Sequence, residues 1–235
     1  NFSNAHHWAI LVENIQIHSP RLSNPTKMTD TQALAIFCKT PKKGFVKTRL
    51  AASVGDQKAL EIYLDLLNIT DKETRPFSSS RHLFLASALE DSVEKMRSTL
   101  QQRDLFTDPK TSFAIQQGED LGQRMIAAFK KLFQNHQSVV LIGCDLPDLT
   151  SALISNAFDA LQSNDVVIGP SCDGGYYLIG LNKETSDLFK EISWSTEKVL
   201  NQTLEKAERL SLQVQLLDRL QDIDTLEDLH LSKLK

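Results

Sequence analysis

Short, nearly continuous apolar runs alternate along the chain with longer segments whose apolar positions recur every three or four residues. The runs predict strands buried on both faces, at 33–38, 82–86, 111–116, 138–143, 165–169, 176–181 and 212–217. The longer segments predict helices at 56–70, 88–103, 120–133, 151–161, 185–191, 195–209 and 225–234. This alternation predicts an α/β fold with a mostly parallel central sheet and helices on both of its faces.

Several predicted helices begin with residues that cap helix N-termini. Asp120 precedes the helix at 120–133, and Thr150 or Ser151 precedes the helix that ends near Leu161. Thr225 is the candidate cap of the last helix, and Asp228 is its partner in a capping box. Asp148 and Ser195 are further candidate caps, so helix capping alone can explain why these two polar residues occur there.

Residues 1–27 differ from the remainder because they mix His, Asn, Ser and Pro and show no clear period. Met28, followed by TDTQ, has the character of a natural start. The stretch WAILV is too short for a signal-peptide core and lacks a basic flank. We therefore expect an extension at 1–27, poorly ordered or non-native, and a single domain at 28–235.

Composition excludes several classes of function. The net charge of −4 and the pI near 5.9 give no indication of nucleic acid or an anionic membrane as a partner. No apolar run approaches the roughly 20 residues that span a bilayer. The three cysteines, Cys38, Cys144 and Cys172, are widely spaced and do not form a disulfide or zinc pattern. We expect the cysteines to be small buried side chains that cluster, and we expect the protein to reside in a reducing cytoplasm.

Ligands of open α/β sheets bind beyond the carboxyl ends of the strands, which directs attention to the loop at 39–51. This loop carries five positive charges in a chain that is acidic overall: Lys39, Lys42, Lys43, Lys47 and Arg49. Pro41 and Gly44 favour tight turns. Basic side chains and backbone N–H groups at such a position bind phosphate, although the loop is neither GxxxxGK[ST] nor GxGxxG. The alternative is a solvated surface loop.

Carboxylates follow two other predicted strands. Asp145 ends the strand in LIGCDLPDLT, where it faces the ligand crevice and, together with a diphosphate, can hold Mg²⁺ or Mn²⁺. Asp222 or Asp224 in QDIDTLEDL can supply a second oxygen to the same ion. The alternative for Asp224 is that it only organises the turn before the last helix.

The segment GPSCDGGYYLIGL interrupts an apolar region with Asp173, Gly174 and Gly175. The glycines let a sugar or phosphate approach the backbone closely, and Asp173 offers a carboxylate to a hydroxyl group. Tyr176 and Tyr177 add an apolar wall with polar tips. A bulge or turn without a ligand is the alternative. Elsewhere, Arg124 is a possible phosphate partner and Trp194 can line an acceptor pocket.

Six motifs together resemble a known family: KTPKKGFVKTRLA, GEDLGQRM, LIGCDLPDLT, GPSCDGGYYLIGL, ISWST and DIDTLEDL. They occur in the order typical of a bacterial glycosyltransferase-like family labelled arsenosugar biosynthesis glycosyltransferase or radical SAM/selenodomain-associated transferase. The resemblance runs from about Ala33 to Leu229. It implies the Rossmann-like glycosyltransferase A fold of the nucleotide-diphosphosugar transferases. It also implies that Lys39, Lys47 and Arg49 lie in the phosphate loop, that Asp145 binds the metal and that Asp173-Gly174-Gly175 lines the sugar or acceptor side.

One departure from the family pattern bears on the reaction. Many glycosyltransferases of this fold carry Asp-x-Asp, but Pro147 stands where the second Asp would be. Asp-x-Pro and the DIDTLEDL ending resemble the nucleotidyltransferases of the same superfamily. The alternative reaction therefore joins a nucleoside triphosphate to a phosphorylated acceptor and releases pyrophosphate.

The sequence thus predicts a metal-dependent glycosyltransferase that uses a nucleotide-diphosphosugar, a small-molecule acceptor and Mg²⁺ or Mn²⁺. A nucleotidyltransferase is the alternative, and a non-catalytic nucleotide-binding module is a third interpretation. The predicted catalytic residue is Asp173, and the predicted metal ligands are Asp145 and Asp224. The predicted nucleotide-phosphate site comprises Lys39, Gly44, Lys47, Thr48 and Arg49. The predicted sugar or acceptor site comprises Gly174, Gly175, Tyr176 and Trp194.

Overall fold

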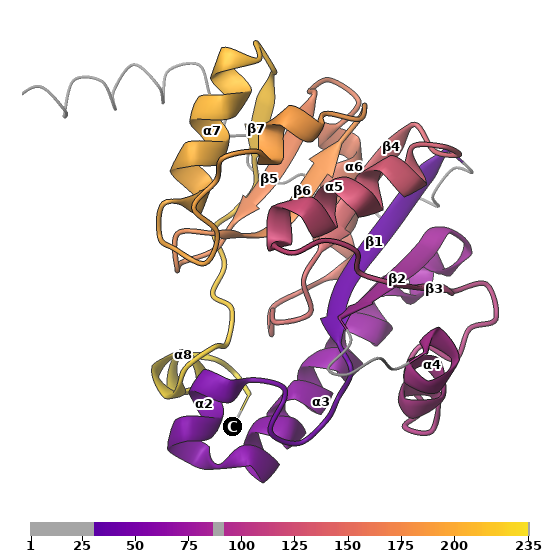
Figure 1. Ribbon diagram of the computed structural model, residues 1–235, viewed down its shortest axis with the longest axis vertical. Helices are drawn as coiled ribbons and strands as arrows, with labels where there is room; N and C mark the ends of the chain where they lie inside the picture. Colours follow the sequence, from indigo (N-terminus) through magenta and orange to yellow (C-terminus); the bar gives the residue numbers. More distant parts are fainter. Residues whose placement is uncertain (1–30, 87–91, 235) are drawn as a thin grey trace, which may run out of the picture.

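A seven-stranded mixed sheet forms the centre of the molecule (Figure 1). The computed structural model describes residues 31–86 and 92–234. Its strands are β1 (Gln32–Lys39), β2 (Arg81–Ala86), β3 (Ser112–Ile115), β4 (Ser138–Ile142), β5 (Val166–Pro170), β6 (Tyr176–Leu181) and β7 (Val214–Leu216). They are ordered β3-β2-β1-β4-β6-β5-β7, and only β6 runs antiparallel to its neighbours. The predicted α/β fold with a mostly parallel sheet is confirmed.

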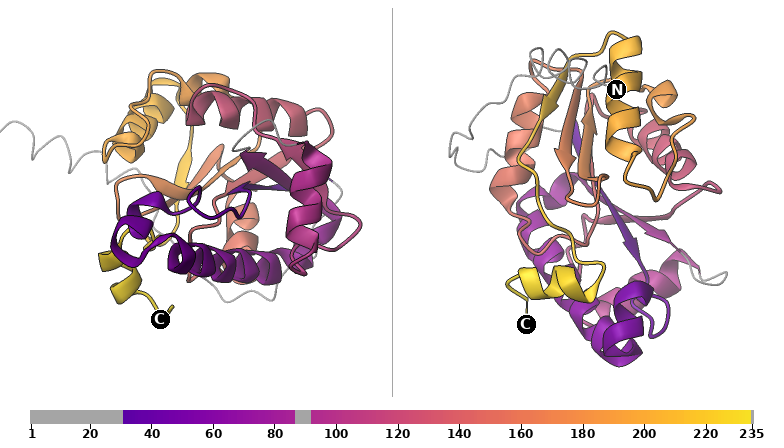
Figure 2. Two further views of the ribbon diagram at one scale, coloured as in Figure 1. Left: turned by 60° about the horizontal axis from the view of Figure 1, so that its bottom comes forward. Right: turned by 90° about the vertical axis from the view of Figure 1, so that its left-hand side faces the viewer.

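Helices cover both faces of this sheet (Figure 2). The α-helices are α2 (Thr48–Val54), α3 (Asp56–Thr74), α4 (Val93–Gln101), α5 (Leu121–Leu132), α6 (Ser151–Ala160), α7 (Val199–Arg209) and α8 (Leu226–Leu231). Two short 3₁₀ helices are η1 (Arg75–Ser80) and η2 (Ser186–Phe189). One face packs against α3, α4 and α6, and the other packs against α5, η2 and α7. None of the described helices has the length and apolar character needed to cross a bilayer.

The continuous apolar runs follow from this burial of both faces. In β1, Leu34 and Ile36 point into the core beneath α3, α4 and α6, whereas Ala33 and Ala35 point toward α5 and α7. Successive side chains of a strand alternate between faces, so a strand covered on both sides needs apolar residues throughout. Cys38 and Cys144 join the first core as small buried residues. Cys172 is exposed, so the prediction that all three cysteines are buried is wrong for it.

The predicted caps are present at three helices. The Asp120 side chain accepts a hydrogen bond from the backbone N–H of Gln123 at 2.8 Å, and the Thr150 side chain accepts one from Leu153. Thr225 and Asp228 form the complete capping box of α8. Asp148 is not a cap, because Thr150 takes that role.

The structure also differs from the predicted elements at several places. Helix α2 begins within the predicted loop at 39–51 and extends beyond it. Its Leu50 is buried in a small third core with Leu66 of α3 and Leu229 of α8. These tertiary contacts stabilise a helix too short to form alone. The predicted helix at 185–191 is only the 3₁₀ turn η2, and α7 starts at Val199 rather than at 195. The predicted extension at 1–27 lies outside the described residues.

Candidate functional site

A cleft of about 820 Å³ opens where β1 and β4 end. These strands are adjacent and parallel, so the loops that follow them lie side by side. The segment after β7 and the loop between β5 and β6 complete the walls. The charged residues that line the cleft are Lys39, Lys47, Arg49, Arg124, Asp145, Asp173, Glu197, Asp222 and Asp224. Cationic and anionic side chains from segments far apart in the sequence therefore share one cavity.

Tyr63 of α3 fixes the start of the basic loop. Its buried hydroxyl lies 2.8 Å from the backbone nitrogen of Lys39, 3.0 Å from the backbone oxygen of Lys39 and 3.3 Å from Cys144 Sγ. The hydroxyl accepts from the Lys39 N–H and donates to the Lys39 carbonyl. It therefore ties the ends of β1 and β4 together at the cleft. In the sequence Tyr63 showed only helical spacing, which did not distinguish it from an ordinary core residue.

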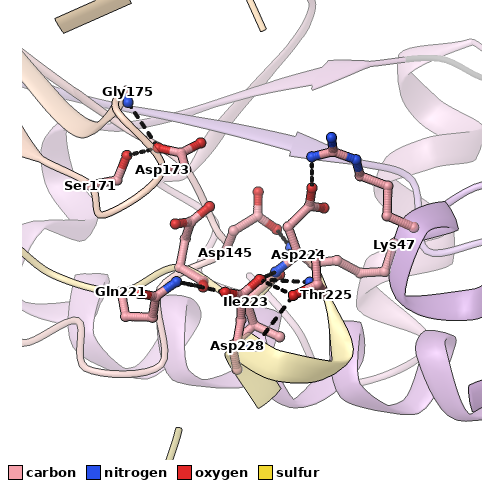
Figure 3. A network of polar contacts seen from close by, with 12 residues as sticks. Lys47, Asp145, Ser171, Asp173, Gly175, Gln221, Ile223, Asp224, Thr225 and Asp228 are labelled. Atoms are coloured by element: carbon pink, nitrogen blue, oxygen red, sulfur yellow. Dashed lines mark hydrogen bonds and ion pairs between the residues drawn. The ribbon is translucent and has the colours of Figure 1, made fainter. Parts of the chain in front are cut away.

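Lys47 carries its charge into the base of the cleft. It precedes α2 in the left-handed conformation, with φ 49°, and its side chain is buried. The ammonium group donates to the carbonyl oxygen of Ile223 and forms an ion pair with Asp145 (Figure 3). Burial alone lowers the pKa of Lys47, but the charge and hydrogen bond of Asp145 outweigh burial and raise that pKa. Lys47 is therefore a charged, buried link between β4 and the segment after β7.

Arg49 forms a second link to the same segment. Its guanidinium lies 2.9 Å from Asp224 Oδ2. The side chains of Arg49 and Asp224 are 76% and 39% exposed, whereas the Lys47 side chain is only 5% exposed. An exposed ion pair of this kind contributes little to stability. Arg49 and Asp224 are consequently free to exchange partners when a charged ligand enters the cleft.

Asp222 is the acid whose surroundings perturb it most. Burial and the nearby charges of Asp173 and Asp145 raise the pKa of Asp222 to about 6, although a backbone hydrogen bond and the charge of Lys47 act in the opposite direction. Its Oδ1 atom is buried and has no hydrogen-bond partner among the described residues. A buried carboxylate oxygen without a partner is unfavourable unless a proton or a cation reaches it.

Asp173 is held in a fixed orientation by its own loop. Its Oδ1 accepts hydrogen bonds from the Ser171 hydroxyl and, at 2.8 Å, from the backbone N–H of Gly175 (Figure 3). These two donors bind the same oxygen atom, so the carboxylate cannot rotate freely. Asp173 therefore presents its second oxygen in a constant direction.

The far wall of the cleft is the turn at 193–198. Trp194 packs against Gly122 of α5, where an added Cβ would lie 2.5 Å from the indole Nε1 atom. It also meets the Tyr176 ring edge-on, with centroids 6.5 Å apart. Ser195, which follows, has φ 63° and does not cap α7, contrary to one expectation. The turn is thus held by packing on both sides rather than by a helix cap.

The oxygen donors suit a hard divalent cation but do not form a complete site. Asp145, Asp222 and Asp224 offer carboxylate oxygens, which Mg²⁺ and Mn²⁺ prefer, and the Asp222 Oδ1 atom lacks a partner. Within residues 31–86 and 92–234, no three His, Cys, Asp or Glu side chains are arranged as a metal site. The acids therefore fit a cation that takes its remaining ligands from elsewhere, such as diphosphate oxygens.

Most of the predicted site residues line this one cleft. Those that do are Lys39, Lys47, Thr48, Arg49, Asp145, Asp173, Gly175, Tyr176, Trp194 and Asp224. Two predicted residues, Gly44 and Gly174, do not line it. Gly44 makes a turn with φ 75°, and the space beside Gly174 is filled by the backbone of Glu197. A protein backbone, rather than a ligand, explains the close approach at Gly174.

Other lining residues escaped the sequence interpretation. Gln116 directly follows β3 and lines the cleft, with its side-chain amide donating to the Phe84 carbonyl at 2.9 Å. Thr196 and Glu197 line it from the turn before α7. Thr196 belongs to the motif ISWST, but no local pattern marks Gln116 or Glu197, which reach the cleft through the packing of elements distant in the sequence.

Residues 74–196 match the family described as "Uncharacterized protein conserved in bacteria (DUF2064)". A comparison with curated proteins gives no match. Among solved structures, the chain is 35% identical to one described as a "putative nucleotide-diphospho-sugar transferase" from Desulfovibrio desulfuricans G20. That similarity covers 86% of each chain, with a TM-score of 0.76.

Two more distant structures share the fold. The 4-diphosphocytidyl-2C-methyl-D-erythritol synthase from Anaerococcus prevotii DSM 20548 is 12% identical over 86% of this chain and 95% of that chain, with a TM-score of 0.54. Rv0371c from Mycobacterium tuberculosis H37Rv, crystallised with manganese, is 12% identical over 85% of this chain and 96% of that chain, with a TM-score of 0.50. At such identities the similarity concerns the fold alone.

Proposed function

The chain belongs to the DUF2064 family, and from this starting point we propose that it is a metal-dependent glycosyltransferase that uses a nucleotide-diphosphosugar as donor. The observation that carries the proposal is the meeting of Lys47 and Arg49 with Asp145, Asp222 and Asp224 in one cleft at the strand ends. The similarity to a nucleotide-diphospho-sugar transferase supports the class of donor. We also propose that a single domain at 28–235 carries the activity.

The cationic residues are suited to the diphosphate of the donor. Lys39, Lys47 and Arg49 surround the end of β1, and each offers positive charge to phosphate oxygens. When the glycosidic bond breaks, negative charge develops on the departing diphosphate, and fixed cations stabilise it. Asp145 and Asp224 would hold Mg²⁺ or Mn²⁺, and Asp222 offers a further oxygen. The chemistry that the ion supplies when bound is neutralisation of this same charge.

Asp173 is the proposed general base. The hydrogen bonds from Ser171 and Gly175 orient it, and it lines the cleft together with Tyr176 and Trp194. In that position its second oxygen accepts the proton from an acceptor hydroxyl as the hydroxyl oxygen attacks the sugar carbon, and the bond between that carbon and the diphosphate breaks to release the nucleoside diphosphate. The aromatic side chains are suited to an apolar face of the sugar or the acceptor.

A nucleotidyltransferase is the second candidate. Pro147 replaces the second acid of Asp-x-Asp, and Lys47 and Arg49 suit a triphosphate as well as a diphosphate. The two reactions differ in their products. Screening nucleotides and nucleotide sugars by thermal shift, with and without Mn²⁺, identifies the preferred donor, because a ligand stabilises the state that binds it. Release of a nucleoside diphosphate from a nucleotide-diphosphosugar supports glycosyl transfer, whereas pyrophosphate release from a triphosphate contradicts it. Tight binding without turnover contradicts both.

Replacing Asp145 tests its role as a metal ligand. We expect Asp145→Asn to lower Mn²⁺-dependent turnover of the preferred donor by about a hundredfold or more, because charge stabilisation in the cleft is lost. Asp148→Asn is the matched control, since Asp148 lies three residues along, pairs with Lys233 and does not line the cleft. Equal activity of Asp145→Asn and Asp148→Asn would remove Asp145 from the mechanism.

A further inference from the structure

The free protein already places a cation on the acid that is proposed to hold the metal. The Lys47 ammonium forms an ion pair with Asp145 Oδ1 and donates to the Ile223 carbonyl. The Lys47 side chain is only 5% exposed, whereas that of Asp145 is 47% exposed. Asp145 is therefore reached by solvent on one side and neutralised by a buried charge on the other.

This arrangement opposes a second cation at Asp145. The carboxylate has one negative charge, which Lys47 already balances, and a divalent ion on its other oxygen would lie close to the ammonium group. Like charges at such short range repel, and the burial of the Lys47 side chain limits the screening of this repulsion by water. Arg49 pairs with Asp224 at a more exposed position, so two of the three acids are paired with basic side chains in the structure.

A diphosphate changes the balance. Its oxygens carry more negative charge than Asp145 does and bind ammonium groups well. Lys47 lies at the start of α2, beside Thr48 and Arg49, which also line the cleft. A diphosphate placed over this loop therefore competes directly with Asp145 for the Lys47 ammonium. The carboxylate that it releases is then available to a divalent cation.

We propose that Lys47 couples the two ligands of the cleft: it suppresses divalent-cation binding at Asp145 until a diphosphate draws its ammonium group away. This inference rests on the proposed function, because it takes Asp145 as a metal ligand. By linkage, the metal strengthens nucleotide binding by the same factor by which the nucleotide strengthens metal binding. The same movement releases the Ile223 carbonyl, so the segment after β7 responds to occupancy of the cleft.

The test measures Mn²⁺ binding to the nucleotide-free protein by calorimetry, together with the electron paramagnetic resonance signal of the free ion. We expect Lys47→Gln to bind Mn²⁺ about tenfold more tightly than the wild type, within the usual range of coupling between two sites. Lys43→Gln is the matched control, because it removes the same charge from an exposed position in the same loop. Its affinity is expected to stay within about twofold of the wild type.

Lys47→Met is the second variant, because a long apolar side chain fills the buried position if Gln does not fold. Unchanged or weaker Mn²⁺ binding by both folded variants would overturn the proposal. Asp145→Asn separates the two hypotheses. If it abolishes Mn²⁺ binding while Lys47→Gln gains nothing, the coupling is wrong and the metal site stands. If the Lys47 variants do not bind Mn²⁺ in the absence of nucleotide, the coupling is wrong. If the wild type also fails to bind Mn²⁺ in the presence of a nucleoside diphosphate, the metal-dependent function fails as well.

Discussion

His82 lies outside the cleft, and the fold controls its protonation. It lies in β2, where its Nδ1 is 2.6 Å from the Ser112 hydroxyl and its ring meets His136 edge-on, with centroids 5.4 Å apart. Burial lowers the pKa of His82 to about 4, and the charges of His136 and Lys131 act in the same direction. The imidazole is therefore neutral in the folded protein near neutral pH.

This shift predicts a loss of stability in acid. The pKa of folded His82 lies below its ordinary value of 6.5, so between these values the unfolded chain binds more protons. The contribution of His82 to the free energy of unfolding is complete above about pH 6.5 and is lost progressively as the pH falls toward 4. Between pH 7.5 and pH 5, we expect the free energy of unfolding of His82→Gln to fall by about 1–2 kcal/mol less than that of the wild type, a difference that allows for the partial exposure of His82.

Urea unfolding at the two pH values measures this difference. His230→Gln is the control, because His230 is exposed on α8. The interpretation is wrong if His82→Gln and the wild type lose the same free energy of unfolding on acidification.

At the scale of elements, the cleft depends on how α3 packs beneath β1 and β4. Tyr63 of α3 binds both backbone groups of Lys39 and touches Cys144, so one helix aligns two strand ends. The C-terminal segment makes the opposite wall. Its Ile223 contacts Lys47, which precedes α2, and its Asp224 contacts Arg49, which lies within α2. The basic loop is thus held from both sides by elements remote from it in the sequence.

Removing the Tyr63 hydroxyl tests this link. Tyr63→Phe keeps the buried ring but leaves the partly buried backbone groups of Lys39 without their partner. We expect the free energy of unfolding to fall by about 1–3 kcal/mol. We also expect hydrogen exchange at the Lys39 amide to become faster. The control is Thr70→Val, which removes a buried hydroxyl bonded within α3 to Leu66. Unchanged exchange at Lys39 in Tyr63→Phe would show that the loop is positioned by other contacts.

At the scale of the whole molecule, chain segments more than 20 residues apart meet at Gly174. A Cβ there would lie 2.6 Å from the Cα of Glu197, and φ is +89°. The backbone N–H of Leu200 donates to the Gly174 carbonyl at 2.9 Å. The loop that carries Asp173 is therefore pressed against the start of α7, which aligns the proposed base with the turn that carries Trp194.

Three glycine substitutions separate strain from crowding. Gly143→Ala should be nearly neutral, because nothing lies within 4 Å of the new Cβ. Gly55→Ala should cost about 1–3 kcal/mol of stability, because its φ of +82° suits only glycine although the space is open. Gly174→Ala should cost more than Gly55→Ala, because it adds a collision with backbone. Chemical unfolding gives the three values, and an equal cost at Gly55 and Gly174 would contradict the close packing.

The sequence determined the class of the fold and the order of its strands along the chain, because burial on both faces demands continuous apolar runs. It also determined several local features, such as the capping box of Thr225 and Asp228, because these depend on residues within one turn. Asp145 and Arg49 could be placed at a cleft for a related reason: parallel strands put their carboxyl ends on one edge.

Only the tertiary structure decided which charges pair and what the glycines contact. The sequence does not distinguish Asp222 from Asp224, whereas packing buries an oxygen of Asp222 and turns Asp224 toward Arg49. Nothing near Lys47 in the chain reveals its pairing with Asp145, and nothing near Gly174 reveals Glu197 beside it. Local propensity acts over a few residues, but these contacts join segments that meet only when the sheet and its helices have assembled.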